Sequence, residues 1–358
     1  MPFDPNKPYN DLPFLPPGSE IETSVILKKT ISASRALAKL SAGKALPNQS
    51  VLLNTVFLKE AKESSEIENI VTTDDELYEA MANVEKAFTP NTKEVLHYVD
   101  ALWKGMDWIQ KNKPLTTNAF IEIVQTVKRN TAAVRKHSGT KIVNQSTKTT
   151  IYTPPEGEEV IRKLLRNLEE FINVDNGIDP LVKMAVAHYQ FEAIHPFGDG
   201  NGRSGRIINI LYLVSCGLLE TPILYLSKYI IDHKAGYYRN LQRVTSHRDW
   251  EGWILYMLDA VEQTAQFTEK KMHAIMALME QTKVHMNTSV PFYSKELLEL
   301  LFQQPYCKTQ FLVKSGIAKE QTARKYLDTL VSIEILESIK IGREKLYINK
   351  PFLELLKE

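Results

Sequence analysis

The residues with the clearest chemical potential lie at positions 195–206, where the sequence reads HPFGDGNGRSGR. Arg203 and Arg206 are three residues apart, so on a helix they would share a face and offer paired donors to phosphate. Asp199 supplies a hard carboxylate, the kind of ligand that Mg²⁺ takes beside phosphates. The imidazole of His195 can accept a proton near neutral pH. These residue types predict chemistry on a phosphate-bearing ligand, with a metal, cationic stabilisation and a base.

The elements around this stretch would bring those residues together. Pro196 ends an apolar helix near position 194, because its ring clashes with helical continuation and biases His195 away from the right-handed helical region. A second helix starts near position 202, and the free N–H groups of its first turn form an anion site. Asn201 can donate from its side chain into the same cavity. The glycines that free the loop backbone are Gly198, Gly200, Gly202 and Gly205.

Plainer interpretations of the same stretch compete with this one. A glycine-rich turn between helices is often only a turn, and a single histidine often has a structural place. Two arginines at a helix start oppose the helix dipole unless an anion binds there, which favours a binding site. Neither a zinc site nor a P-loop fits, because His188 and Glu192 have no further histidine at ligand spacing and the glycine-to-lysine spacing is absent.

Positions 195–206 resemble the HxFx(D/E)GNGRxxR motif of the Fic family at every defined position. The resemblance implies a protein adenylyltransferase that uses Mg²⁺ and moves AMP from ATP to a Ser, Thr or Tyr hydroxyl. It implies that His195 takes the hydroxyl proton, that Phe197 packs inward and that Asp199 holds the metal. Arg203 would contact the phosphate chain and Arg206 the γ-phosphate. The implied ATP contacts in the loop are Gly200, Asn201, Gly202, Arg203, Ser204, Gly205 and Arg206. The residue types alone leave AMP transfer and phosphate transfer open.

A second motif lies upstream on a predicted helix. Ser64 and Glu68 are four residues apart and share a face, although a solvent-facing acidic residue is the simpler interpretation. The stretch resembles the (S/T)xxxE(G/N) inhibitory motif of Fic proteins, with Ser64, Glu68 and Asn69 at the matching positions. The resemblance implies that Glu68 pairs with Arg206 and takes the donors that the γ-phosphate needs.

Two further features surround the loop. Residues 139–155 predict a β-hairpin with a polar tip at 144–148, closed off by two prolines. In the Fic resemblance this hairpin would be the flap that aligns a target segment by strand pairing, whereas the plain alternative is a hairpin covering the core. Tyr237 and Tyr238 resemble the pair that borders the adenine pocket, with Tyr238 the candidate contact, although aromatic residues in helices are usually core.

The fold class that these patterns predict is mainly α. Apolar spacings of three and four predict helices at 77–88, 93–111, 117–129, 158–173, 180–194 and 265–282. We expect an N-terminal arm and helical region with the inhibitory motif at 1–90, and a Fic-type helical core with the hairpin flap at 91–285. Three helices and two strands predict a winged-helix domain at 291–358.

Composition limits where the protein works and what it binds. The net charge of +1 gives no global field for nucleic acid or a membrane, and only two cysteines are present, both in apolar stretches. No apolar run is long enough to span a bilayer and no signal peptide is evident, so we expect a soluble, cytoplasmic protein. The winged helix is compatible with DNA, but its weak basic character favours protein contact or dimerisation equally.

The expected partner is a target protein with a hydroxyl side chain, and self-modification and a homodimer remain open. A rival hypothesis is a DNA-binding regulator that uses the loop as a nucleotide sensor. A third is an enzyme with the same loop that removes AMP or transfers another phosphate-containing group.

Overall fold

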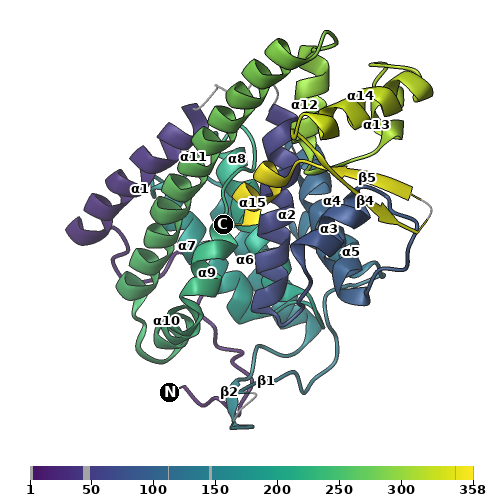
Figure 1. The fold of residues 1–358 in the computed structure, drawn as a ribbon. Helices are drawn as coiled ribbons and strands as arrows, with labels where there is room; N and C mark the ends of the chain where they lie inside the picture. Colours follow the sequence, from purple (N-terminus) through teal and green to yellow (C-terminus); the bar gives the residue numbers. More distant parts are fainter. Residues whose placement is uncertain (1–2, 43–48, 112, 145–146, 343, 358) are drawn as a thin grey trace.

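The computed structural model describes residues 3–42, 49–111, 113–144, 147–342 and 344–357. Its architecture is mainly helical, as the sequence predicts, with two small sheets (Figure 1). The elements before the C-terminal region are α1 (Ser24–Ala42), α2 (Gln49–Ile67), α3 (Asp74–Met81), α4 (Pro90–Gln110), α5 (Thr117–Lys128), β1 (Ile142–Val143), β2 (Thr150–Tyr152), α6 (Glu158–Asn173), α7 (Pro180–Ile194), α8 (Asn201–Ser215), α9 (Leu226–Asp232), α10 (Lys234–His247) and α11 (Trp250–Ser289). The C-terminal elements are α12 (Lys295–Gln303), β3 (Tyr306–Cys307), α13 (Thr309–Lys314), α14 (Glu320–Ser332), β4 (Glu337–Ile341), β5 (Glu344–Ile348) and α15 (Lys350–Lys357).

The centre of the fold is the helix pair α7 and α8, which flanks the chemical loop. Nearly every side chain of α7 is buried, including the polar groups of Lys183, His188 and Gln190. A helix buried on all sides must lie between other elements. α8 is buried in the same way from Asn201 to Leu213, so the loop between the two helices is held by rigid supports.

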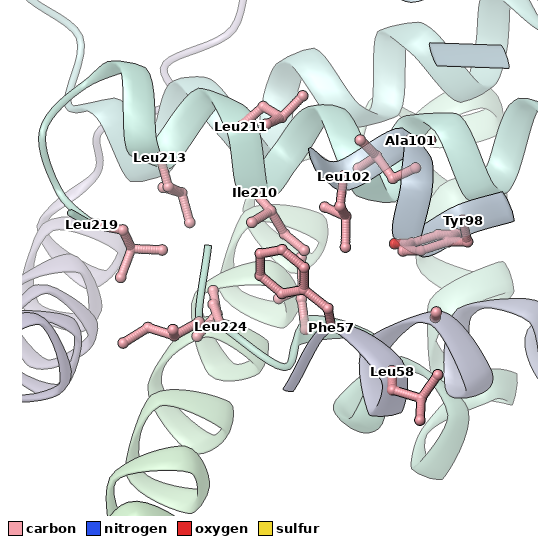
Figure 2. Close-up of a cluster of buried hydrophobic side chains, with 14 of the residues drawn as sticks. Phe57, Leu58, Tyr98, Ala101, Leu102, Ile210, Leu211, Leu213, Leu219 and Leu224 are labelled. Carbon is pink, nitrogen blue, oxygen red and sulfur yellow. The ribbon is translucent and has the colours of Figure 1, made fainter. Parts of the chain in front are cut away.

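The helix α2, which leads into the predicted inhibitory motif, packs against α4 and α8. Phe57 of α2 is fully buried in a cluster with Leu102 of α4 and Ile210 of α8 (Figure 2). Burying an aromatic side chain of this size contributes roughly 1.5–3 kcal/mol. As a result of this packing, one face of α2 is directed toward the start of α8.

The structure shortens one predicted helix and lengthens another. The helix expected at 77–88 ends at Met81, because Asn83 takes a left-handed conformation with φ 51° and Pro90 starts α4 as its first residue. The helix expected at 265–282 is part of α11, which ends at Ser289 just before Val290 and the helix-breaking Pro291. That end falls between the two predicted units, although the division of the chain into three units stays a prediction.

The C-terminal region contains the predicted helices and hairpin, and two elements that the patterns missed. β3 adds to the hairpin so that the antiparallel sheet has the order β3-β5-β4. α15 packs against α11. Both were missed because a two-residue strand and an eight-residue helix are too short to form without the rest of the fold.

The predicted hairpin is present as β1 and β2, with Ile142 opposite Tyr152. It rests on the end of α7, where the Tyr152 hydroxyl donates to the Ala193 carbonyl at 2.8 Å, and on the N-terminal arm, where Tyr9 N–H donates to Thr153. Figure 1 shows the N-terminus beside this hairpin. Two residues of the predicted tip, Gln145 and Ser146, lie outside the described residues.

Within the part of the chain that the structure describes, we find no helix with the length and apolar character that crossing a membrane requires.

Candidate active site

The loop between α7 and α8 turns sharply at His195. This residue caps α7 in a left-handed conformation (φ 48°, ψ 58°), and its N–H donates to the Phe191 carbonyl. Positive φ is uncommon for a residue with a side chain, and Pro196 disfavours the helical alternative. The sequence therefore places the imidazole at the point where the chain leaves α7, as predicted.

Asn201 fastens the loop to itself instead of donating into the cavity. Its side-chain oxygen accepts from the Phe197 N–H at 2.9 Å, and its amide donates to the Phe197 carbonyl at 2.8 Å. Phe197 is fully buried, so the expectation that it packs inward is confirmed. Gly200 completes the turn with φ 82°, and a Cβ there would crowd Val124 and Lys128. The loop is therefore held in place before any ligand binds.

The start of α8 carries both predicted arginines, and both are almost completely buried. Arg206 donates to the Ser64 hydroxyl at 2.7 Å, to the Ser64 carbonyl at 2.8 Å and to a carboxylate oxygen of Glu68 at 3.0 Å. Arg203 donates to Glu94 of α4 at 2.7 Å. The predicted pairing of Glu68 with Arg206 is thus present, and it joins two residues far apart in the chain.

The Glu68 carboxylate lies over the first turn of α8. A Cβ built on Gly202 would overlap the Glu68 oxygen and approach the Arg206 guanidinium. A carboxylate here receives the favourable field of the helix N-terminus as well as the arginine. Glu68 therefore occupies the place that the sequence predicted for an anion. Asn69, the last motif residue, ends this helical segment in a left-handed conformation, with φ 61°.

Burial opposes the charge on Arg206, but the Glu68 carboxylate and neighbouring groups outweigh it, so the pKa of Arg206 lies above its usual value. Burial, together with the nearby Arg135 charge, lowers the pKa of His195 to about 4, against an opposing effect of Glu68. The sequence placed His195 near neutrality, whereas its surroundings keep the ring unprotonated at pH 7.

Asp199 is the most exposed charged group of the loop. Its side chain is 67% exposed and pairs with Lys128 of α5 at 2.7 Å. Partial burial acts to raise the pKa of Asp199, but Lys128 and Arg203 outweigh it and the pKa is lowered. Across the described residues there is no cluster of three or more His, Cys, Asp or Glu side chains that could hold a metal. Asp199 is therefore an ionised single carboxylate at the mouth of the site.

A cavity of about 330 Å³ opens beside the loop, between the hairpin and α10. Its walls include Ile142 and Tyr152 of the hairpin, Glu192 of α7 and Tyr238 of α10. Tyr238 is 46% exposed there, while Tyr237 is buried with its hydroxyl 2.9 Å from Nε2 of His188. Burial raises the pKa of Glu192 to about 7. The hairpin and Tyr238 thus line one cavity, and their roles in binding a target and adenine stay predictions.

Two of the predicted contacts turn toward the protein interior. The Ser204 hydroxyl is buried without a hydrogen-bond partner in the described part of the chain. A Cβ on Gly205 would stand 2.6 Å from a Glu192 oxygen and 3.1 Å from the Phe191 ring. Gly205 therefore permits close packing of α8 on α7, a role that its place in a ligand motif did not indicate.

Arg135 is a residue beside the site that sequence reasoning missed. It lies before the hairpin, is 7% exposed, and its guanidinium donates to the backbone carbonyls of His195 at 2.7 Å and of Ile194 at 3.2 Å. Its own N–H donates to the Pro196 carbonyl. Arg135 therefore clamps the turn that presents the imidazole, and no periodicity in its irregular segment pointed to this.

The helical core and its glycine-rich anion loop define a class of protein built around the α7–loop–α8 site. Three family models match this chain: the Fic/DOC family over residues 114–213, the Fic/DOC family N-terminal region over 27–107, and the "Protein adenylyltransferase SoFic-like, C-terminal domain" over 278–352. The chain belongs to the Fic family.

Relatives agree with this assignment. A probable protein adenylyltransferase of Aquifex aeolicus is 39% identical over 79 residues, which cover 22% of this chain and 24% of that protein. Protein adenylyltransferase fic-1 of Caenorhabditis elegans is 29% identical over 114 residues, covering 31% of this chain and 21% of that protein. The matches span about a quarter of the length of these relatives.

Solved structures share the fold. A Fic family protein from Desulfovibrio desulfuricans has a TM-score of 0.61 at 19% identity, covering 94% of this chain and 98% of that one. Fic-1 from C. elegans has a TM-score of 0.54 at 18% identity, covering 70% and 73%.

Proposed function

We propose that this protein transfers AMP from ATP to a hydroxyl group of a protein and that Glu68 inhibits the transfer. The proposal is supported by the family, by relatives named protein adenylyltransferases, and by the loop geometry. The single observation that carries it is the buried Arg206 at the start of α8, paired with Glu68 beside a neutral imidazole. A site built for several phosphate oxygens and a proton acceptor fits phosphoryl-type transfer.

In the proposed reaction the nucleotide phosphates bind at the N-terminus of α8, with Arg206 on the γ-phosphate and Arg203 on the chain. The target hydroxyl oxygen forms a bond to the α-phosphorus while the bond to the β-phosphate oxygen breaks, so pyrophosphate leaves. His195 Nε2 accepts the hydroxyl proton, since the ring is neutral. Arg135 holds the backbone of His195 in position throughout.

Asp199 fits a role as the protein ligand of Mg²⁺. Its carboxylate is exposed and ionised, and Mg²⁺ in nucleotide sites commonly takes one or two carboxylates together with phosphates and water. When bound, the ion would neutralise phosphate charge. Lys128 would then exchange its partner, because it also lies 3.3 Å from Glu94.

Inhibition follows from competition for the same donors. Glu68 takes one Arg206 donor and covers the first turn of α8, where the γ-phosphate would bind. Two anions cannot share this place without strong repulsion. Displacing Glu68 would free the site, and we propose that adenine then lies near Tyr238 and that a target segment pairs with the hairpin.

The experiment is incubation with Mg²⁺ and ATP labelled at the α- or γ-phosphate, followed by intact-protein mass spectrometry. A hydrogen bond between charged groups is worth about 1.5–3 kcal/mol, so Glu68→Gly should raise AMP incorporation about tenfold or more. Glu66→Gly, a change at the same end of α2, is the matched control and should leave it unchanged. Adding His195→Ala to the active variant should lower transfer by roughly 10²–10⁴-fold.

Each result tests a separate part of the proposal. Label arriving only from the γ-phosphate would indicate phosphate transfer instead, and equal AMP incorporation with and without Glu68 would overturn inhibition by this residue. Undiminished transfer in the His195→Ala variant would remove the proposed base.

A further inference from the structure

A second cavity, of about 200 Å³, lies on the other side of the inhibitory helix. It is enclosed by α2, the start of α9, α11 and α15, and Figure 1 shows α15 lying between α11 and α2. At about 30 Å³ per liquid water this is the volume of roughly seven waters, enough for one ring with a polar substituent. Its lining includes four lysines, Lys59, Lys228, Lys271 and Lys357.

The lining combines an apolar body with a cationic rim. Phe267, Ile275 and Leu356 are among the hydrophobic walls, while four lysines line the cavity against a single glutamate, Glu63. The Tyr225 hydroxyl already donates to Glu63 at 2.8 Å. An amphipathic cavity with this charge excess favours an anion with an apolar body.

Three of the four lysines, Lys59, Lys228 and Lys357, have carboxylate partners that lie outside the lining, and Lys271 donates to the Leu355 carbonyl at 2.7 Å. Asp74 is shared between Lys59 at 3.0 Å and Lys62 at 2.9 Å, so one carboxylate serves two ammonium groups. Lys228 pairs with Asp232 one helical turn away at 2.5 Å. The Lys228–Asp232 pair is partly exposed, and a pair of this kind contributes only about 0–1 kcal/mol, so a bound anion can replace it at little cost. Lys59 and Asp74 are only 13% and 14% exposed at their side chains, so this pair stays in place.

We propose that this cavity, named here the α2–α15 pocket, binds a small carboxylate or phosphate ester with an aromatic or short aliphatic body. The anionic head would lie on the lysine rim and the body between Phe267 and Leu356. No residue of the pocket belongs to the nucleotide loop.

The pocket shares a helix with the inhibitory motif. Thr55, Lys59 and Glu63 form one row of α2, and Glu60, Ser64 and Glu68 form the adjacent row, one residue or about 100° around the helix. The pocket exists in the conformation in which Glu68 pairs with Arg206. If displacing Glu68 moves α2 and alters the pocket, a ligand binds the paired conformation more tightly than the other, favours the pairing by that difference in affinity and opposes nucleotide binding. This coupling rests on the proposed function, whereas the binding site does not.

The first test is calorimetry of the unmodified protein with benzoate, phenyl phosphate and benzyl alcohol, which share a ring and differ in charge. We expect both anions to bind about tenfold or more tightly than the alcohol, because charge-assisted hydrogen bonds hold the head. Equal affinity for all three would show that only the ring is recognised and would overturn the proposal. Absence of anion binding would also overturn it.

The second test removes one ammonium group of the rim. Lys228→Met should weaken benzoate binding about threefold to tenfold, while Lys111→Met should not. The control is matched, because Lys111 also pairs with an aspartate four residues away, Asp107, at 2.5 Å. Equal effects of the two changes would place the binding elsewhere.

The third test measures Mg²⁺–ATP affinity with saturating benzoate. Benzoate should weaken ATP binding to the unmodified protein and have no effect on the Glu68→Gly variant. If benzoate binds but ATP affinity does not change, the coupling is wrong. If ATP fails to bind even to the Glu68→Gly variant, the proposed function is wrong, and the proposed pocket is not contradicted.

Discussion

Arg206 shows how a single residue connects two parts of the molecule. Its guanidinium is buried, so its donors need partners, and Ser64 of α2 and Glu68, just after α2, supply them for Nε and Nη2. A phosphate could serve the same donors. Under the proposed function, Arg206 would therefore have partners in two arrangements, which is what a competition between inhibitor and substrate requires.

The protonation of His195 gives the prediction at this scale. A lowered pKa favours the neutral ring, so the ring should stay neutral as the pH falls through 6.5 and take up a proton only near pH 4. At pH 6 an ordinary imidazole is about three-quarters protonated, whereas this one should be about one per cent protonated.

The measurement is an NMR titration of the histidine rings in the unmodified protein, with the His195 signal assigned by its loss in His195→Ala. A midpoint near 6.5 would show that the ring is solvated and would contradict the burial described here.

At the scale of elements, the site depends on how closely α4 and α8 approach. A Cβ on Gly105 of α4 would overlap a Leu211 methyl group of α8, and both residues lie in the core. Only glycine lets the two helices meet at this distance, which positions Glu94 of α4 to bind Arg203.

Gly105→Ala should therefore destabilise the fold. Overpacking lowers the free energy of unfolding by about 1–3 kcal/mol, and the better helix propensity of alanine offsets about 1 kcal/mol of this loss. We expect a net loss of about 1 kcal/mol, seen as a melting temperature lower by about 1–2 °C.

The control is Gly18→Ala, where a Cβ would meet nothing within 4 Å. A melting temperature of Gly105→Ala at or above that of the control would show that Leu211 moves aside without cost.

At the scale of the whole molecule, the C-terminal sheet is bonded to the segment around α3. The Lys308 ammonium, 7% exposed at its side chain, donates to the Asn83 carbonyl at 2.7 Å and to Glu344 at 2.6 Å. The Tyr306 hydroxyl donates to Asp75 at 2.8 Å. Since α3 follows the inhibitory motif closely, the C-terminal region is tied to the part of the chain that carries Glu68.

Lys308→Met should loosen this attachment, because it leaves the Asn83 carbonyl and Glu344 without their buried partner, at a cost of about 1–3 kcal/mol. Hydrogen exchange in residues 306–308 and 344–348 should become faster. Lys345→Met, which removes an exposed pair with Asp328, is the control and should not change it. Equal exchange in both variants would mean that Lys308 does not hold the sheet.

Much of the local structure could be read from the sequence. The helices at 158–173 and 180–194 begin and end as predicted, because three-and-four spacing and proline positions act within a few residues. The loop motif also identified the residues that lie together at the start of α8, because they are only a few residues apart in the chain. Asn201 departed from expectation because its nearest partner was the backbone of Phe197, four residues away.

The linear order of residues determined which helices form, where the glycine loop interrupts them, and which side chains lie together on the first turn of α8. Only the tertiary structure decided that Arg206 meets Ser64 across 142 positions, that Glu94 holds Arg203, and that Arg135 clamps His195. It also decided where the two cavities lie. The physical reason is that spacing fixes neighbours within a helix, whereas contacts between distant segments depend on how whole helices pack.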